Sequence, residues 1–353
     1  HYFQGKTCSW SRKCNCRLYF SYAVEAVPVG GASSSSSSSS NSREIPSAVI
    51  KDEVDRLLRA SISRNTHRSY STGLSAFDTF RASNRLPNVW PPMVEHLVSF
   101  VATLSLRGLA DTTARSYISS IGFQCKVLGK CDKTQNFLVG KVLEGMKRLK
   151  HRVDTRLPIT GPILAQIVKV LPLVCLNKFE ALLFQAAFTM AFFGFFRVGE
   201  LCLSKGGNPS HVVGRGDVTL VQGQYVQVHL RYSKTDQSGK GTIIQLRASD
   251  NEICPLKAME AFLKVRPGVG GPLLCHFSGE PVTRYQFSSV LQKALRYLDM
   301  DTASFKTHSF RIGAASAAFK AGHTADAIKE AGRWKSNCYS HYIRIPIITF
   351  PDL

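Results

Sequence analysis

The sequence predicts a mainly α-helical protein with a small antiparallel β-sheet, arranged as an all-α domain followed by an α+β domain. Its 353 residues suit about two domains, each large enough to bury a core. Apolar residues repeat with a helical period through residues 45–153. The proline-containing stretch HRVDTRLPITGP, residues 151–162, is typical of a connector, and β-type alternation begins only beyond it, from residue 217 to 246.

The charge balance points to a polyanionic partner. The chain has 45 Lys and Arg against 24 Asp and Glu, a formal net charge of +21. Such an excess favours nucleic acid, because lysine and arginine are spread through segments that should be folded. A ribosome-like or membrane-surface protein would be expected to carry them in basic tails. No apolar run approaches the length of a transmembrane span.

The cysteine pattern predicts reduced thiols and no metal site. The ten cysteines include no recurring CxxC pair and no Cys/His quartet with zinc spacing. Cys8, Cys14 and Cys16 cluster, but they have no fourth partner nearby. A secretory leader is disfavoured because Glu25 interrupts the apolar stretch and no disulfide framework follows.

Residues 1–44 are expected to form a disordered N-terminal segment that ends in a serine-rich linker. The octaserine tract in this segment cannot bury apolar surface, so folded structure should begin near Ile45.

Residues 45–153 are predicted to form a compact helical domain with basic side chains for nucleic acid, which the resemblance described below makes a DNA-binding domain. Asp111 or Thr112 is a plausible helix cap. Three sets of apolar residues each share a helical face: Tyr70, Leu74, Phe77 and Phe80; Val94, Leu97, Val98 and Val101; and Tyr117, Ile118 and Ile121. The basic residues available to phosphates are Arg64, His67, Arg68, Arg115, Lys147, Arg148 and Lys150. The alternative for each of them is a merely solvated helix face.

The second domain, residues 157–353, should begin with helices. Thr160 can cap the first, and the next, within residues 178–204, is almost wholly apolar and therefore interior. Arg197 lies near its end, and a half-buried arginine needs a carboxylate, carbonyls or a bound anion. Glu200 follows three residues later, so a simple Arg197–Glu200 pair is the structural alternative to an anion site.

A β-hairpin should follow. Residues 217–246 contain a short strand, a Gln-Gly turn, a strand with Tyr225, Val226 and Val228, and a last strand at Thr242–Leu246. Lys234 lies where the middle strand runs into the hairpin turn, a position equally open to an ordinary surface lysine. Helices are predicted again from residue 256 and from residue 283.

The stretch 308–344 collects polar groups on short helices. Alanines and glycines in residues 306–322 predict a helix that packs closely against a neighbour, with His308 and Arg311 on one face. A second helix should stop at Gly332, which leaves Trp334 just beyond it. Tyr339 and Tyr342 then lie three residues apart in a last helical turn.

These groups suit phosphoryl transfer onto a tyrosine hydroxyl. Fixed guanidinium groups stabilise the charge that spreads over a phosphodiester in the transition state. A tyrosine attacks only if cations lower its pKa or a base takes its proton. The leaving sugar oxygen needs a proton donor, for which lysine is suited.

With these motifs, residues 48–344 resemble a tyrosine recombinase of the phage integrase class. The family pattern contains R-x-x-E/D, a hairpin lysine, H-x-x-R, a His or Trp, and a tyrosine eight or nine residues later. The matching residues are Arg197, Glu200, Lys234, His308, Arg311, Trp334 and Tyr342. The GRWKS and YIR strings further resemble recombinases of eukaryotic mobile elements such as Cryptons and DIRS-like retroelements.

The resemblance implies a role for each matching residue. Arg197 and Arg311 would clamp the scissile phosphate, and His308 would assist proton transfer from Tyr342. In the same way Lys234 would protonate the 5′ oxygen, Trp334 would donate its indole N–H to a nonbridging oxygen, and Glu200 would position Arg197 or His308. Tyr339 is expected to pack in the core or against Trp334, because one helical turn moves a hydroxyl by about 5 Å.

The resemblance implies a site-specific DNA recombinase that forms a 3′-phosphotyrosyl intermediate and needs no metal, cofactor or ATP. Its partner would be double-stranded DNA, and it would assemble as a homo-tetramer, although only eleven residues follow Tyr342. Two alternatives remain: a domesticated DNA-binding protein without activity, and a type IB topoisomerase-like relaxing enzyme. The expected location is nuclear for a eukaryotic mobile-element recombinase, and otherwise cytoplasmic or nucleoid.

Overall fold

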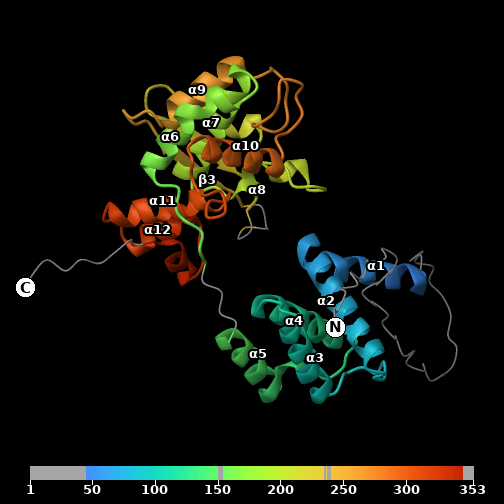
Figure 1. The fold of residues 1–353 in the computed structure, drawn as a ribbon. Helices are drawn as coiled ribbons and strands as arrows, with labels where there is room; N and C mark the ends of the chain where they lie inside the picture. The colour runs from blue at the N-terminus through green and yellow to red at the C-terminus, as the bar shows by residue number, and fades with distance from the viewer. Residues whose placement is uncertain (1–44, 150–153, 234–235, 237–239, 345–353) are drawn as a thin grey trace, which may run out of the picture. The chain divides into compact units, whose positions relative to one another are not determined.

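Two compact units make up the chain. In the computed structural model, residues 45–149, 154–233, 236 and 240–344 are described. The first unit comprises residues 1–153 and the second residues 154–353 (Figure 1). The predicted disordered segment 1–44 and the DNA-binding candidate Lys150 lie outside the described residues.

The described part of the first unit is all helical, as predicted. Its elements are α1 (Ser47–Ala60), α2 (Arg64–Ser83), α3 (Val94–Leu106), α4 (Asp111–Val127), the 3₁₀ turn η1 (Lys133–Gln135) and α5 (Phe137–Leu149). Most residues of the predicted apolar faces are buried in its core, while Tyr70, Val94, Val98 and Tyr117 are half-buried. The rings of Phe77, Phe80 and Phe100 pack together, with Phe100 5.1 and 5.3 Å from the other two.

One detail of this unit differs from the prediction. Neither Asp111 nor Thr112 caps α4, because the extended residue before the helix is Ala110, which has no capping side chain. Asp111 is instead the first helical residue. A carboxylate there still favours the helix, since it lies near the positive end of the helix dipole.

The second unit combines helices with a small sheet. Its helices are α6 (Gly161–Val174), α7 (Lys178–Phe193), α8 (Val198–Leu201), α9 (Pro255–Val265), α10 (Arg284–Tyr297), α11 (Ser309–Lys320) and α12 (Ala325–Gly332). The 3₁₀ turns are η2 (Pro209–His211), η3 (Arg215–Asp217) and η4 (Asn337–Tyr342), and the strands are β1 (Val218–Val221), β2 (Tyr225–Leu230) and β3 (Thr242–Arg247).

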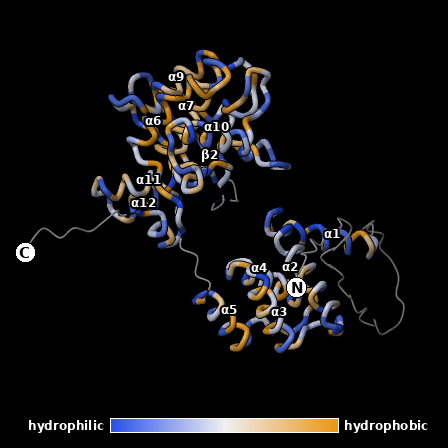
Figure 2. The backbone as a smooth tube through the Cα atoms, viewed as in Figure 1, coloured by the Kyte–Doolittle hydropathy of each residue, from blue (hydrophilic) through white to orange (hydrophobic). Residues whose placement is uncertain are grey.

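Helix α7 is the interior helix that the sequence predicts. Ten of its residues are buried, and long hydrophobic stretches run along it (Figure 2). Helix α6 packs beside it and begins at the predicted cap, where Thr160 Oγ1 accepts a hydrogen bond from Ile163 N at 3.5 Å. Burial of apolar surface is the main favourable contribution to folding, so this helix stabilises the unit.

The sheet has the order β1-β2-β3 with both pairs antiparallel. Val218 pairs with Val228, and Val226 pairs with Leu246, so these buried residues share the face that the sheet turns toward the core. The predicted hairpin between β2 and β3 is therefore confirmed. This connection carries Lys234, which lies outside the described residues.

Helix α11 packs closely against the segment that leads into α6. Ile159 N donates to Ser309 O at 3.0 Å, and a Cβ at Gly313 would lie 1.8 Å from Ile159 O. Only glycine permits this approach, as the small residues of the sequence predict. The contact fixes α11, the helix that carries Arg311.

Candidate active site

The Arg197–Glu200 pair forms at a break in the chain. Helix α7 ends at Phe193, Phe195 has a φ of 49°, and Arg197 immediately precedes α8. Arg197 Nη1 and its backbone N donate to the two oxygens of Glu200, each at 2.9 Å. Glu200 is buried, so it supplies the carboxylate that a half-buried Arg197 requires.

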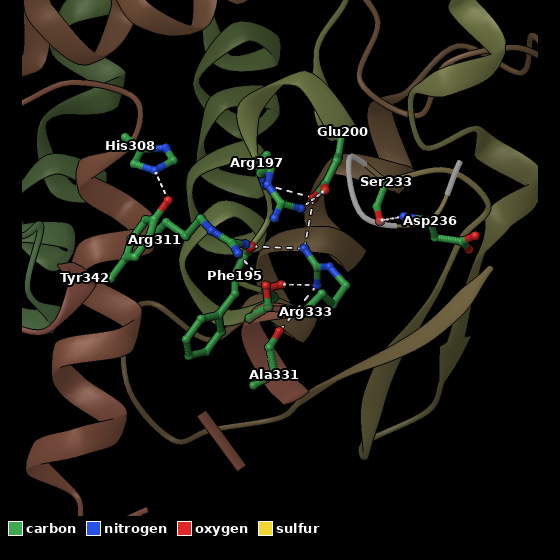
Figure 3. Close-up of polar contacts among 12 residues, drawn as sticks. Phe195, Arg197, Glu200, Ser233, Asp236, His308, Arg311, Ala331, Arg333 and Tyr342 are labelled. Atoms are coloured by element: carbon green, nitrogen blue, oxygen red, sulfur yellow. Dashed lines mark hydrogen bonds and ion pairs between the residues drawn. The ribbon is translucent and has the colours of Figure 1, made fainter. Parts of the chain in front are cut away.

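Arg311 is the most deeply buried of the predicted site residues that the structure describes, with 1% of its surface exposed. Its Nη1 donates to Phe195 O (Figure 3), and its Nη2 donates to Gly332 O. Its guanidinium carbon also lies 4.3 Å from the centroid of the Trp334 ring. Burial lowers the pKa of Arg311, and repulsion from nearby arginines lowers it further. Arg311 thus joins α11 to the break after α7 and to the end of α12.

Tyr342 and His308 are in contact, although they are 34 residues apart in the sequence. His308 Nε2 and Tyr342 Oη are 2.7 Å apart, and Figure 3 shows the two side chains pointing toward each other. His308 precedes the first residue of α11, and Tyr342 ends η4. Burial lowers the pKa of His308 to about 4, and repulsion from Arg156, Arg311 and Arg197 adds to this shift. The imidazole is therefore neutral at pH 7 and can accept a proton.

Trp334 packs beside this pair. It is 8% exposed, its ring centroid lies 4.8 Å from that of Tyr342, and it meets Phe195 edge-on at 6.2 Å. Its contacts with Arg311 and Tyr342 make it a platform that holds both groups.

The two tyrosines differ in their surroundings. Tyr339 is half-buried against the core, and Lys329 Nζ lies 5.6 Å from its ring centroid. Tyr342 contacts His308, and its ring centroid lies 5.7 Å from the guanidinium carbon of Arg311. The nucleophile predicted from spacing is therefore the tyrosine that lies among the predicted site residues.

Arg333 belongs to the same cluster, and the sequence reasoning missed it. Its Nη2 donates to Glu200 Oε2 at 2.9 Å and to Phe195 O at 3.0 Å, and its Nη1 donates to Gly194 O at 3.1 Å. Helix α12 stops as predicted near Gly332, but the left-handed residue that follows the helix is Arg333, with a φ of 54°. The signal that could have identified Arg333 is its position directly before Trp334, in the GRW string.

Ser316 holds the backbone around the predicted nucleophile. Its Oγ donates to Tyr342 O at 3.3 Å and accepts from Arg344 N at 2.9 Å. Arg344 Nη2 also donates to Asp154 at 2.8 Å. Neither Ser316 nor Asp154 stands in a motif, so only the folded chain reveals these contacts.

The predicted DNA-binding residues of the first unit lie on its surface. Arg64, Arg68, Arg115, Lys147 and Arg148 are exposed, and His67 is half-buried. Ser69 Oγ and Ser116 Oγ are 2.9 Å apart, so α2 and α4 touch next to Arg68 and Arg115.

The described part of the chain offers neither a metal site nor a membrane-spanning helix. Within it, no group of three or more His, Cys, Asp or Glu side chains could hold a metal ion. The helices of the same residues include none that is long and apolar enough to cross a membrane.

Comparison with known proteins identifies the fold. Residues 55–122 match the family described as phage integrase, N-terminal SAM-like domain. No curated protein matches the chain significantly. Among solved structures, it resembles the Tn1549 transposon integrase in complex with transposon right end DNA, with a TM-score of 0.60 and 12% identity over 85% of this chain and 95% of that one.

Two further structures are similar. A lambda integrase dimer bound to a COC′ core site has a TM-score of 0.57 and 16% identity, covering 86% of this chain and 78% of that one. A post-cleavage complex of XerH site-specific recombinase with palindromic difH substrate has a TM-score of 0.57 and 14% identity, covering 83% and 81%. The tyrosine recombinase fold expected from the sequence is therefore confirmed.

Proposed function

We propose that this chain is a site-specific DNA recombinase or integrase, with Tyr342 as its nucleophile and a 3′-phosphotyrosyl link as its intermediate. The observation that carries the proposal is the 2.7 Å contact between Tyr342 Oη and His308 Nε2, beside Arg311 and Trp334. The DNA-bound recombinases that share the fold support DNA as the substrate.

The reaction follows from this arrangement. Tyr342 Oη attacks the phosphorus of a phosphodiester and passes its proton to the neutral His308 imidazole. The Tyr–O–P bond forms and the P–O5′ bond breaks, so the 5′ oxygen leaves with a proton, which we assign to Lys234. Attack by a 5′ hydroxyl reverses these steps, and no ATP is needed because the phosphodiester energy is kept.

Cations would stabilise the transition state from two directions. Arg197 uses Nη1 for Glu200, while its Nε and Nη2 make no hydrogen bond to any residue that the structure describes, so they are available to a phosphate oxygen. Arg311 adds positive charge beside the Tyr342 ring. Its Nη1 and Nη2 donate to the Phe195 and Gly332 carbonyls, while its buried Nε makes no hydrogen bond to any residue that the structure describes. Trp334 would support both Arg311 and Tyr342.

A nicked suicide substrate tests the proposal. Cleavage near a nick releases a short oligonucleotide and traps covalent protein, which a denaturing gel separates from free DNA. The adduct should form with the unmodified chain and with Tyr339→Phe, and it should disappear in Tyr342→Phe. A folded, DNA-binding protein without an adduct would favour a catalytically silent DNA-binding protein. Adduct with relaxation of supercoiled DNA, but without strand exchange, would favour a type IB topoisomerase-like enzyme.

The remaining assignments extend this proposal. Assembly of four copies on DNA rests on the resemblance. Residues 345–353, which follow Arg344, lie outside the described residues. Origin in a eukaryotic mobile element, and with it a nuclear location, rests on the GRW and YIR strings. Crosslinking of the protein on two recombination sites tests the assembly state.

A further inference from the structure

A cavity of about 270 Å³ lies beside Tyr342 in the second unit. It is lined by Asp154, Arg156, Ile312, Cys338, His341 and Tyr342. Neither Asp154 nor Arg156 belongs to the motif residues, since both come from the stretch that the sequence predicts to be a connector. A cationic side chain in a cavity next to the nucleophile calls for a ligand with negative charge.

Asp154 holds Arg156 in a fixed orientation. Arg156 Nε donates to Asp154 Oδ1 at 2.8 Å and Nη2 donates to Oδ2 at 3.0 Å, the paired geometry that fixes a guanidinium plane. Arg344 Nη2 donates to the same carboxylate at 2.8 Å. Hydrogen bonding from Arg156 lowers the pKa of Asp154 to about 2, so the carboxylate is ionised at pH 7. Two guanidinium groups and one carboxylate leave a net positive charge.

Arg156 still has donors for a ligand. Its Nη1 makes no hydrogen bond to the residues that the structure describes, and 40% of its side chain is exposed. Its charge also acts on the nucleophile's surroundings, since among the nearby arginines it has the largest effect on the pKa of His308. Because Tyr342 lines the same cavity and contacts His308, the positive face of the cavity is close to the His308–Tyr342 pair.

We propose that Arg156, oriented by Asp154, binds a nonbridging oxygen of the DNA backbone phosphate next to the one that Tyr342 attacks. The neighbouring phosphate suits this position, because the phosphates of one strand follow each other every ~3.4 Å along the helix axis. A phosphate suits a guanidinium with a free donor better than a base does, since a base would call for stacking partners. That Tyr342 attacks a phosphate rests on the proposed function, but binding of the neighbouring phosphate by Arg156 needs no cleavage.

The test measures binding without chemistry, in a Tyr342→Phe background, by fluorescence anisotropy at several salt concentrations. Arg156→Gln should weaken binding and lower the slope of log K against log salt by about 0.9, the value for one lost phosphate contact. Arg156→Lys should keep most of the slope. Arg296→Gln, which removes an exposed arginine on α10, is the control and should leave it unchanged. An unchanged slope in Arg156→Gln would overturn the proposal.

Neutral methylphosphonate groups then locate the contact. Placed at one flanking phosphate, the modification should weaken binding of the Arg156 protein and should have no added effect in Arg156→Gln. Coupling at the cleaved phosphate, or at no flanking phosphate, would overturn the proposal. Thermal unfolding checks each variant. If Arg156→Gln proves unstable, the effect of the methylphosphonate is measured in the Arg156 protein and in Arg156→Lys. Weaker binding at a flanking phosphate in both proteins supports the contact, and unchanged binding in both overturns the proposal. In another outcome, the methylphosphonate weakens binding only when Arg156 is present, while the chain with Tyr342 forms no covalent adduct on the nicked substrate. That result would refute the proposed function but would leave the phosphate contact of Arg156 standing.

Discussion

Arg333 donates a hydrogen bond to Glu200 at 2.9 Å although the two residues are 133 positions apart in the chain. Glu200 also accepts two hydrogen bonds from Arg197, so one buried carboxylate joins both arginines. Burial lowers the pKa of Arg333, and Glu200 opposes this shift. The contact therefore ties the start of α8 to the residue that precedes Trp334.

Substitution of Arg333 should impair cleavage without weakening DNA binding. Arg333→Ala leaves Glu200 with one cation and removes a buried ion pair, which should cost about 3 kcal/mol in unfolding free energy. Arg333→Gly loses the same pair but tolerates the φ of 54°, so it should be more stable than Arg333→Ala by about 1 kcal/mol. Urea unfolding and single-turnover cleavage measure both effects.

Arg333→Lys separates positioning from simple stability. It keeps a charge for Glu200 but cannot make all the guanidinium contacts, so cleavage should recover in part while affinity stays unchanged. Cleavage at the unmodified rate in Arg333→Ala, with a stable fold, would contradict a positioning role.

The helices were predictable because their burial is periodic. Phe77 and Phe80, or Leu97 and Val101, are buried in the core, and their separation of three or four positions in the sequence is that of one helical face. The strands were predictable for the same reason, with alternation at Val226 and Val228. The start of α4 was placed less well, because Ala110 has no side chain that could signal a cap.

The contacts within the site were predictable from local geometry only where one motif holds both partners, whereas the resemblance to the family pattern was needed to name Arg311, Trp334 and Tyr342. Arg197 and Glu200 are three residues apart, so their pairing follows from local geometry. Arg333 was missed because a left-handed residue after a helix is usually glycine, and Gly332 stood in the expected place. Arg156 was missed because it lies in a stretch that looks like a linker, and only the folded chain places it in one cavity with Tyr342.

Gly313→Ala should destabilise the second unit. Its Cβ would lie 1.8 Å from Ile159 O and 2.6 Å from Ile159 C, and both atoms of Ile159 belong to backbone that cannot turn aside. Overpacking of this kind costs about 1–3 kcal/mol, more than the ~1 kcal/mol that alanine gains over glycine within a helix. Gly161→Ala is the matched control, since nothing lies within 4 Å of its Cβ. Thermal unfolding should show a loss for Gly313→Ala only; equal midpoints would contradict the close packing of α11.

Acid should destabilise the fold through His308. Its pKa of about 4 in the folded chain lies below the usual 6.5, so the unfolded chain binds more protons between these values. His308 therefore contributes stability that is present above pH 6.5 and is lost as pH falls toward 4. Urea unfolding of His308→Asn should depend less steeply on pH in this window than the unmodified chain.

Arg156 offers an independent check of that pKa. Removal of its charge in Arg156→Gln should raise the pKa of His308, because Arg156, Arg311 and Arg197 disfavour the imidazolium and only Asp154 favours it. Titration of the His308 ring by NMR measures the change. A value near 6.5 in the unmodified chain would refute the depressed pKa.

Arg68 and Arg115 should contribute to affinity but not to chemistry. Both are exposed, on helices that touch at Ser69 and Ser116. Loss of both arginines should lower the salt slope of DNA binding by about 1.8, two contacts at ~0.9 each, while cleavage at saturating protein is unchanged. Arg107→Ala, at the end of α3, removes an exposed arginine as a control. A slope equal to that of the control would assign both residues to a solvated face.

Ser316 should control how Tyr342 is presented. Its hydroxyl bonds Tyr342 O and Arg344 N on either side of Ile343, so it fixes the backbone that carries the tyrosine. Ser316→Ala loses both hydrogen bonds, which together should contribute about 1–1.5 kcal/mol to holding Tyr342 in place. The cleavage rate should therefore fall roughly tenfold, while the DNA concentration that gives half-maximal cleavage stays the same.

A conservative variant and a neighbouring serine make this last prediction specific. Ser316→Thr keeps the hydroxyl and should restore the rate. Ser340→Ala removes a hydrogen bond to Asn337 O within η4, without touching the carbonyl of Tyr342, and should leave the rate nearly unchanged. Equal losses in Ser316→Ala and Ser340→Ala would mean that stability of the turn, rather than the grip of α11 on the Tyr342 backbone, limits cleavage. A loss confined to Ser316→Ala and reversed by threonine has no such explanation, because the Ser316 hydroxyl joins α11 to the backbone on both sides of Ile343.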